Sequence, residues 1–128
     1  MKFYITLTII LFSSAFAKAQ LQTPALSPGA TLKQTVGLTD IEVQYSRPSV
    51  KGRTVFGAQG LLPYGEFWRV GANAATKFTF DQDITLAEKS LAKGSYTLLV
   101  KPFENEWNFY IYPYTSSTWT HYVNEEPL

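Results

Sequence analysis

Residues 94–112, with the sequence GSYTLLVKPFENEWNFYIY, decide the fold. Every second position from Tyr96 to Val100 is apolar or aromatic, and the same alternation runs from Trp107 to Ile111. Such a period of two is typical of half-buried β-strands. The short link between the two runs contains a proline, two glutamates and an asparagine, which favour a turn. The stretch therefore predicts two neighbouring antiparallel strands.

The same alternation recurs towards the N-terminus. It covers residues 32–36 and 41–46, joined by a link that contains Gly37, and it returns at 78–80 and 84–86. A short glycine-containing link between two alternating runs is typical of a β-hairpin. No segment shows a sustained helical period. We therefore expect an all-β antiparallel fold, either a β-sandwich or a partly open barrel.

One long irregular segment, Arg47 to Ala75, interrupts this pattern. It contains five glycines and two prolines, a density that excludes a long helix or strand. It also carries large apolar side chains, so we expect this Gly/Pro-rich loop to pack onto the body of the domain. Loops of this length are uncommon in compact domains and are often functional. The segment is therefore the first candidate for a functional site.

The composition is that of a folded protein and excludes several kinds of chemistry. The chain has 128 residues, which suits one domain, and it is 45% hydrophobic, which suits a packed core. It has no cysteine and one histidine, His121, so disulfide scaffolds, thiol catalysis and multi-histidine metal sites are excluded. The formal net charge of +1 lacks the basic excess of a nucleic-acid-binding protein. We therefore expect no metal, no cofactor and no nucleic acid partner.

The N-terminus has the features of a secretory signal peptide. A lysine follows Met1, residues 3–16 form an uncharged and mostly apolar run, and residues 17–19 (AKA) fit a small-x-small cleavage site. The run is shorter than the about 20 residues that a membrane span needs. We expect cleavage between Ala19 and Gln20, export to the periplasm or the extracellular space, and no membrane span in the mature chain.

This assignment divides the chain into three parts. Residues 1–19 are the predicted signal peptide, residues 20–30 a lead-in segment with two prolines, and residues 31–128 the β-rich domain. Loss of the signal peptide removes two lysines, so the basic residues fall from 11 to 9 against 10 acidic ones and the net charge becomes −1. A charge near zero argues against steering towards a strongly charged partner.

Three segments of the expected mature chain resemble a known family. They are residues 45–53 (YSRPSVKGR), 62–76 (LPYGEFWRVGANAAT) and 91–96 (LAKGSY), in this order. They are similar to segments of the DUF2911 family, exported proteins found largely in Bacteroidetes, and the resemblance covers nearly all of the mature chain. It implies a secreted β-rich domain whose molecular function is not established, and it supplies no catalytic residue.

The resemblance also implies further strands at the C-terminus. Members of the family continue after a segment similar to residues 119–125, whereas this sequence stops at Leu128. The predicted strand at 107–112 also calls for partners on both edges, because an exposed aromatic edge strand favours aggregation. We therefore expect the sequence to be a C-terminally truncated form of a longer β-domain.

Five residues of the long loop form the predicted ligand site. The guanidinium groups of Arg47 and Arg53 suit a carboxylate or a phosphate. Trp68, Arg69 and Asn73 combine an aromatic face, a stacking cation and a hydrogen-bonding amide, which suits a sugar or a small polar molecule. A structural alternative stays open, in which the arginines bond loop carbonyls or acids, Trp68 anchors the loop to the core and Asn73 adopts a turn conformation.

Three classes of function remain open. The favoured one is a non-catalytic binding or envelope-associated module for a small polar or anionic ligand or an envelope protein. The second is a periplasmic enzyme that uses the loop arginines, Glu66 and an asparagine, although the sequence contains no recognisable nucleophile, base or metal set, and His121 is expected at the surface. The third is a structural assembly partner that uses an aromatic edge near Tyr110, Tyr112 and Tyr114.

Overall fold

The computed structural model describes residues 23–128, so the predicted signal peptide lies outside the described residues. β1 begins at Gly29, inside the segment predicted as the lead-in. None of the helices in the described range is long and apolar enough to cross a membrane. The elements are β1 (Gly29–Val36), β2 (Thr39–Ser46), β3 (Lys77–Phe80), β4 (Ile84–Leu86), β5 (Lys89–Leu91), β6 (Gly94–Pro102), β7 (Trp107–Pro113) and the 3₁₀-helix η2 (Trp119–Asn124).

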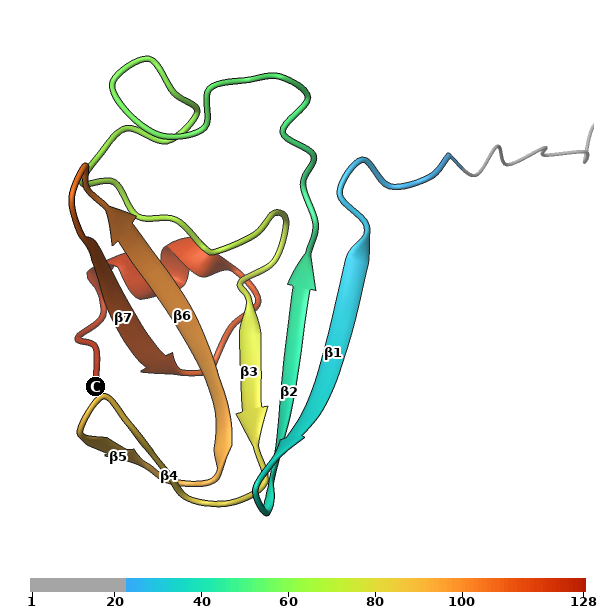
Figure 1. The fold of residues 1–128 in the computed structure, drawn as a ribbon, viewed down its shortest axis with the longest axis vertical. Helices are drawn as coiled ribbons and strands as arrows, with labels where there is room; N and C mark the ends of the chain where they lie inside the picture. Colours follow the sequence, from blue (N-terminus) through green and yellow to red (C-terminus); the bar gives the residue numbers. More distant parts are fainter. Residues whose placement is uncertain (1–22) are drawn as a thin grey trace, which may run out of the picture.

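Five of the strands form one open antiparallel sheet in the order β1-β2-β3-β6-β7, and β4 and β5 form a separate hairpin (Figure 1). Each predicted strand lies within an observed one. The all-β antiparallel prediction is therefore confirmed in a sandwich-like form, and the sheet is not closed into a barrel. The irregular segment between β2 and β3 is confirmed as the long Gly/Pro-rich loop.

The residues in two tight turns explain why the β1–β2 hairpin was predicted from the sequence and the β4–β5 hairpin was not. Gly37 has a φ of +62° in the two-residue turn between β1 and β2, a conformation that glycine adopts without strain. The turn between β4 and β5 consists of Ala87 and Glu88, whose φ values are +47° and +66°. Neither residue signals such a turn, and β5 was therefore not predicted.

The strand register gives the sheet two chemically different faces. Directly paired residues share a face, and alternate residues of a strand point to opposite faces. The apolar face carries Leu32, Val36, Ile41, Val43, Tyr45, Phe78, Phe80, Tyr96, Leu98, Val100, Trp107, Phe109 and Ile111. The polar face carries Thr31, Lys33, Asp40, Glu42, Gln44, Lys77, Thr79, Thr97, Leu99, Lys101, Asn108, Tyr110 and Tyr112.

The main buried cluster lies on the polar face, at the β6–β7 end of the sheet. It consists of Ala75, Leu99, Tyr112 and Tyr122, with Phe67, Tyr110, Tyr114 and Trp119 packed around it. The segment with η2 lies behind β6 and β7 and supplies Tyr122 to this cluster (Figure 1). Burial raises the pKa of Tyr112. The aromatic edge suggested for assembly is therefore covered, because Tyr112 is buried and Tyr110 and Tyr114 are half-buried.

The apolar face is covered only in part. Leu86 and Leu91 of the β4–β5 hairpin line a small apolar cavity together with Phe80 and Ile111. Elsewhere on this face Leu32 is 54% exposed and Phe109 is 62% exposed. Alternation identified this face from the sequence, but burial follows it only in part, since Phe80 and Val100 are buried whereas Leu32 and Phe109 are exposed. The segment with η2 covers part of the other face.

The long loop packs against one end of the sheet (Figure 1). The backbone of Trp68 exchanges hydrogen bonds of 2.8 and 2.9 Å with Val100 of β6. The Trp68 ring meets Phe56 and Trp107 edge to face, with ring centroids 5.7 and 6.2 Å apart. The expectation that this loop packs onto the domain is thus confirmed, since its backbone extends the sheet beside β6.

The buried Tyr122 hydroxyl holds the segment after β7 in place. It accepts hydrogen bonds from the amides of Thr115 and Ser116, at 3.0 and 2.7 Å, and donates to the Ser116 carbonyl at 2.7 Å. One side chain thereby satisfies three backbone groups of a turn that forms no strand or helix.

Tyr122→Phe is expected to destabilise the fold by about 1–3 kcal/mol, because it keeps the ring but leaves three backbone groups without their partner. Urea unfolding followed by circular dichroism measures the loss. Tyr64→Phe is the matched control, because Tyr64 is 46% exposed. Equal effects of the two substitutions would contradict this role of the Tyr122 hydroxyl.

Candidate functional site

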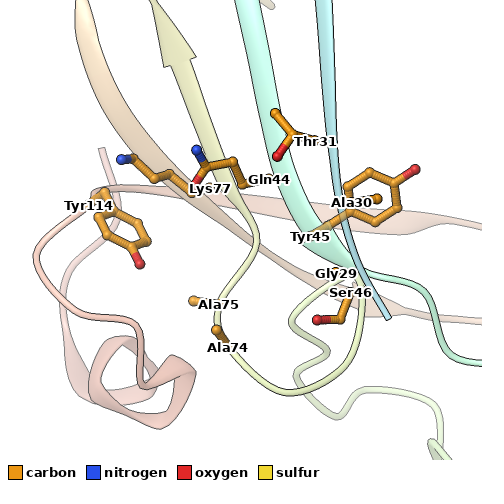
Figure 2. A pocket seen from close by; sticks show the side chains of 10 residues that line it. All are labelled: Gly29, Ala30, Thr31, Gln44, Tyr45, Ser46, Ala74, Ala75, Lys77 and Tyr114. Atoms are coloured by element: carbon orange, nitrogen blue, oxygen red, sulfur yellow. The ribbon is translucent and has the colours of Figure 1, made fainter. Parts of the chain in front are cut away.

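A cavity of about 320 Å³ opens on the polar face, beside the segment that leads into β3. Figure 2 shows the Lys77 and Gln44 side chains and the Tyr114 ring on one side of the sheet, near Ala74 and Ala75. The cavity is named the Lys77 pocket below. Its lining consists of Gly29, Ala30, Thr31, Gln44, Tyr45, Ser46, Ala74, Ala75, Lys77 and Tyr114.

Strand register brings the polar side chains of the Lys77 pocket together. Thr31 of β1 pairs with Gln44 of β2, and Gln44 pairs with Lys77 of β3. Residues paired in this way have Cβ atoms about 5 Å apart on the same face. A hydroxyl, an amide and an ammonium group therefore line up across three neighbouring strands.

Lys77 supplies the positive charge of the pocket. Its side chain is half-buried, and its Nζ lies 5.1 Å from the centroid of the Tyr114 ring. Within residues 23–128 the single ion pair is that of Lys33 with Glu42, at 2.8 Å, so no described carboxylate lies at ion-pair distance from Lys77. The ammonium group is thus available to an anion that enters the pocket.

A carboxylate on the neighbouring strand β2 is already engaged. Glu42 bonds Lys33, and its Oε1 accepts a hydrogen bond of 2.5 Å from Nε2 of Gln44. The hydrogen bond from Lys33 is the main cause that lowers the pKa of Glu42, followed by that from Gln44. The carboxylate is therefore ionised at neutral pH, and its principal counter-charge is Lys33 rather than Lys77.

The segment beside the pocket is held against the end of β2. Asn73 has a φ of +59°, and its Nδ2 donates hydrogen bonds to the carbonyl of Ser27 and to Oγ of Ser46, at 3.2 and 3.3 Å. At Gly71 a Cβ atom would lie 3.0 Å from the Ser46 carbonyl oxygen. The close approach of two backbone segments thus positions Ala74 and Ala75 in the pocket wall.

One of the five predicted site residues, Asn73, lies next to the pocket. Asn73 bonds the pocket residue Ser46. Arg47 lies over the ring of Tyr45, and its Nε donates a hydrogen bond of 3.0 Å to the Tyr45 hydroxyl, on the face of the sheet opposite Lys77. Arg53 instead bonds the carbonyls of its own loop, at Ser49 and Val50, as the structural alternative described.

The other two predicted residues lie among packed aromatic rings. Trp68 packs against Trp107, and its Nε1 donates to the Gly71 carbonyl at 3.2 Å. The guanidinium of Arg69 lies 5.5 Å from the centroid of the Trp119 ring, and its buried Nε has no hydrogen-bond partner among the described residues. The five predicted residues therefore do not converge on one pocket.

The groups suggested for catalysis are also dispersed. Glu66 and His121 are exposed, and His121 lies against the ring of Tyr122, with centroids 5.2 Å apart. In residues 23–128 no three histidine, cysteine, aspartate or glutamate side chains gather in a way that could hold a metal ion. Cationic and polar groups line more than one cavity in the described part of the chain. In the one lined by Lys33, the cation is paired with Glu42, whereas Lys77 has no described carboxylate at ion-pair distance.

Sequence reasoning missed Lys77, Gln44 and Thr31 as a group. Each occupies the polar position of an alternating strand and looks like an ordinary solvated residue. Only the pairing of β1, β2 and β3 brings the three together. The sequence predicts Tyr114 at the aromatic edge, whereas its ring lies against the Lys77 ammonium.

Gly71→Ala is expected to destabilise the protein by about 1–3 kcal/mol, because the added methyl group would press on the Ser46 carbonyl and push the pocket wall outwards. Chemical denaturation measures the change. Gly29→Ala is the matched control, since a Cβ at Gly29 meets nothing within 4 Å, and it should alter stability by less than about 0.5 kcal/mol. A neutral Gly71→Ala would show that the close contact with Ser46 is not required.

The chain was compared with known proteins. The comparison with curated proteins gave no match, and neither did the comparison with solved structures. A family model described as “Protein of unknown function (DUF2911)” matches residues 27–127, which include the whole Lys77 pocket, the long loop and η2. The match confirms the resemblance of the three sequence segments, and the chain belongs to the DUF2911 family.

Proposed function

We propose that the protein is an exported, non-catalytic binding module that holds a small organic anion in the Lys77 pocket. The observation that carries the proposal is the half-buried Lys77 ammonium at an open cavity, with no described carboxylate at ion-pair distance. A charge-assisted hydrogen bond from an ammonium group to a carboxylate is stronger than one between neutral groups. The predicted signal peptide supports the proposed export.

The other pocket groups define the kind of anion. Thr31 and Gln44 offer a hydroxyl and an amide in the same cross-strand row as Lys77, and these groups suit hydroxyls on the ligand. A volume of about 320 Å³ is near the lower end of the range for small-molecule sites. The proposed ligand is therefore a carboxylate with a polar body of about the size of a single sugar acid.

Two further observations support this pocket as the site. It is lined by Tyr45 and Ser46 from the first segment that resembles the family and by Ala74 and Ala75 from the second. Binding is favoured over catalysis because the Asn73 amide is occupied by Ser27 and Ser46. A base or nucleophile paired in the manner of a catalytic dyad is not found among the pocket residues.

Lys77→Gln is expected to weaken the binding of glucuronate at least about tenfold, because the charge-assisted hydrogen bond is lost. Glucose, which has the same ring without the carboxylate, should bind weakly or not at all to the unsubstituted protein. Thermal-shift measurements with both sugars, acetate and succinate, followed by calorimetry, test both expectations.

Lys101→Gln is the matched control for this substitution. Lys101 is also half-buried on the polar face and lies over an aromatic ring, with Nζ 4.1 Å from the Phe67 centroid, but it does not line the pocket. The Lys101→Gln variant should bind the anion with the same dissociation constant as the unsubstituted protein. Failure of every anion to shift the melting temperature, or equal losses in both variants, would overturn the proposed function.

A further inference from the structure

The Gln44 side chain lies between two cavities on the polar face of the sheet. It lines the Lys77 pocket, whereas Glu42, two residues earlier on β2, lines a second cavity of about 300 Å³ together with Lys33. The two side chains meet at the boundary between these cavities, since Nε2 of Gln44 donates a hydrogen bond of 2.5 Å to Oε1 of Glu42. The orientation of one polar group of the Lys77 pocket is therefore fixed by a residue outside that pocket.

This hydrogen bond determines which end of the Gln44 amide faces the pocket. An ionised carboxylate only accepts hydrogen bonds, so the amide nitrogen of Gln44 must face Glu42. The amide oxygen is consequently directed away from Glu42, towards the cavity that Gln44 lines. Figure 2 shows the Gln44 and Lys77 side chains projecting from neighbouring strands on this side of the sheet. Gln44 thus offers the pocket a hydrogen-bond acceptor.

Lys33 holds the Glu42 carboxylate in the position that this orientation requires. The two residues are directly paired between β1 and β2, and Nζ of Lys33 lies 2.8 Å from Oε2 of Glu42. Both carboxylate oxygens are therefore engaged, one by Lys33 and the other by Gln44. The Glu42 side chain is 24% exposed, and partial shielding from water strengthens its hydrogen bonds. Two neighbouring charged residues thus set the direction of the Gln44 amide.

The pocket therefore presents a donor and an acceptor side by side. The Lys77 ammonium only donates and the Gln44 amide oxygen only accepts, and the two residues are paired, which places their Cβ atoms about 5 Å apart. A carboxylate bonded to Lys77 brings its neighbouring carbon close to Gln44. A hydroxyl on that carbon can donate to the amide oxygen, whereas a carbonyl or ether oxygen there would face it as a second acceptor. A neutral hydroxyl also suits the place better than an amino group, whose positive charge Lys77 would repel.

We propose that Gln44 is the specificity-determining residue of the Lys77 pocket and selects 2-hydroxy carboxylates. Glu42 is a positioning residue, which acts through Gln44. Among ligands of the size of a sugar acid, this favours an open-chain acid such as gluconate, which has a hydroxyl beside its carboxylate. The ring form of glucuronate has an ether oxygen at that carbon and should bind less tightly. The proposal rests on the proposed function, because it requires the carboxylate to bind at Lys77, and it adds the chemical class of the ligand.

NMR titrations with lactate and pyruvate test the selection, because these anions have the same charge and nearly the same size but differ in a hydroxyl against a carbonyl oxygen. The unsubstituted protein should bind lactate at least about fivefold more tightly than pyruvate, and gluconate more tightly than glucuronate. Glu42→Gln should reduce the lactate preference to less than about twofold, because an amide at this position can donate as well as accept and no longer fixes Gln44. The lost charge affects both anions alike, so the ratio of the two dissociation constants reports on the amide.

Asp40→Asn is the matched control. Asp40 is another carboxylate of the polar face on β2, but it accepts a hydrogen bond from Thr35 and does not contact the Gln44 amide. The variant removes the same charge and should keep the full preference for lactate. Loss of the preference in this variant as well would overturn the proposal, because charge rather than the amide would then control selection.

The remaining outcomes separate this proposal from the proposed function. Glucuronate binding that Lys77→Gln weakens, without a preference for lactate over pyruvate, would overturn the role of Gln44 and leave the anion site intact. Failure of lactate to bind where glucuronate binds, or a lactate preference that survives Glu42→Gln, would have the same consequence. If none of the four anions bound to the unsubstituted protein, the proposed function and the selection by Gln44 would both be wrong.

Discussion

The structure depends on β6, which is enclosed from both sides. The adjacent residues Leu99 and Val100 point to opposite faces, yet they are 0% and 1% exposed. Leu99 lies in the cluster with Tyr122, and Val100 exchanges backbone hydrogen bonds with Trp68 of the long loop. Because β6 also pairs with β3 and β7, it joins the sheet, the loop and the segment with η2. Loss of packing at β6 would therefore separate the sheet, the long loop and the segment with η2 from one another.

Strand positions were predictable from the sequence, whereas burial was predictable only in part. The alternation in 94–112 placed β6 and β7 correctly because backbone pleating imposes a period of two on any half-buried strand. The hairpin strand β5 was missed, since Ala87 and Glu88 adopt positive φ values without a glycine or asparagine to signal them. The buried face was also unexpected, because the covering Tyr122 lies in a segment that has no strand pattern.

The residues of the candidate site were likewise predictable from the sequence only in part. Asn73 was predicted as a site residue from its chemistry, and it lies next to the Lys77 pocket, whereas Arg47 bonds Tyr45 on the opposite face. Lys77 itself was not predicted, because its importance arises from the pairing of β2 with β3 across a long irregular loop. Register between strands that are distant in sequence is set by tertiary packing, and a single sequence contains no direct record of it. Trp68, by contrast, lies among aromatic rings, as its size and apolar surroundings would suggest.

The strand order has a consequence for the speed of folding. In the order β1-β2-β3-β6-β7, each strand lies beside one that precedes it closely in the chain, apart from the connection through the long loop and the inserted β4–β5 hairpin. The sheet can therefore grow by successive hairpin formation, which keeps contacts local and favours rapid folding for an all-β protein. The one strand pairing across a long connection is that of β2 with β3, which requires closure of the long loop. The entropic cost of this closure rises only with the logarithm of the loop length. A longer connection at this point would therefore add little to the entropic cost of pairing β2 with β3.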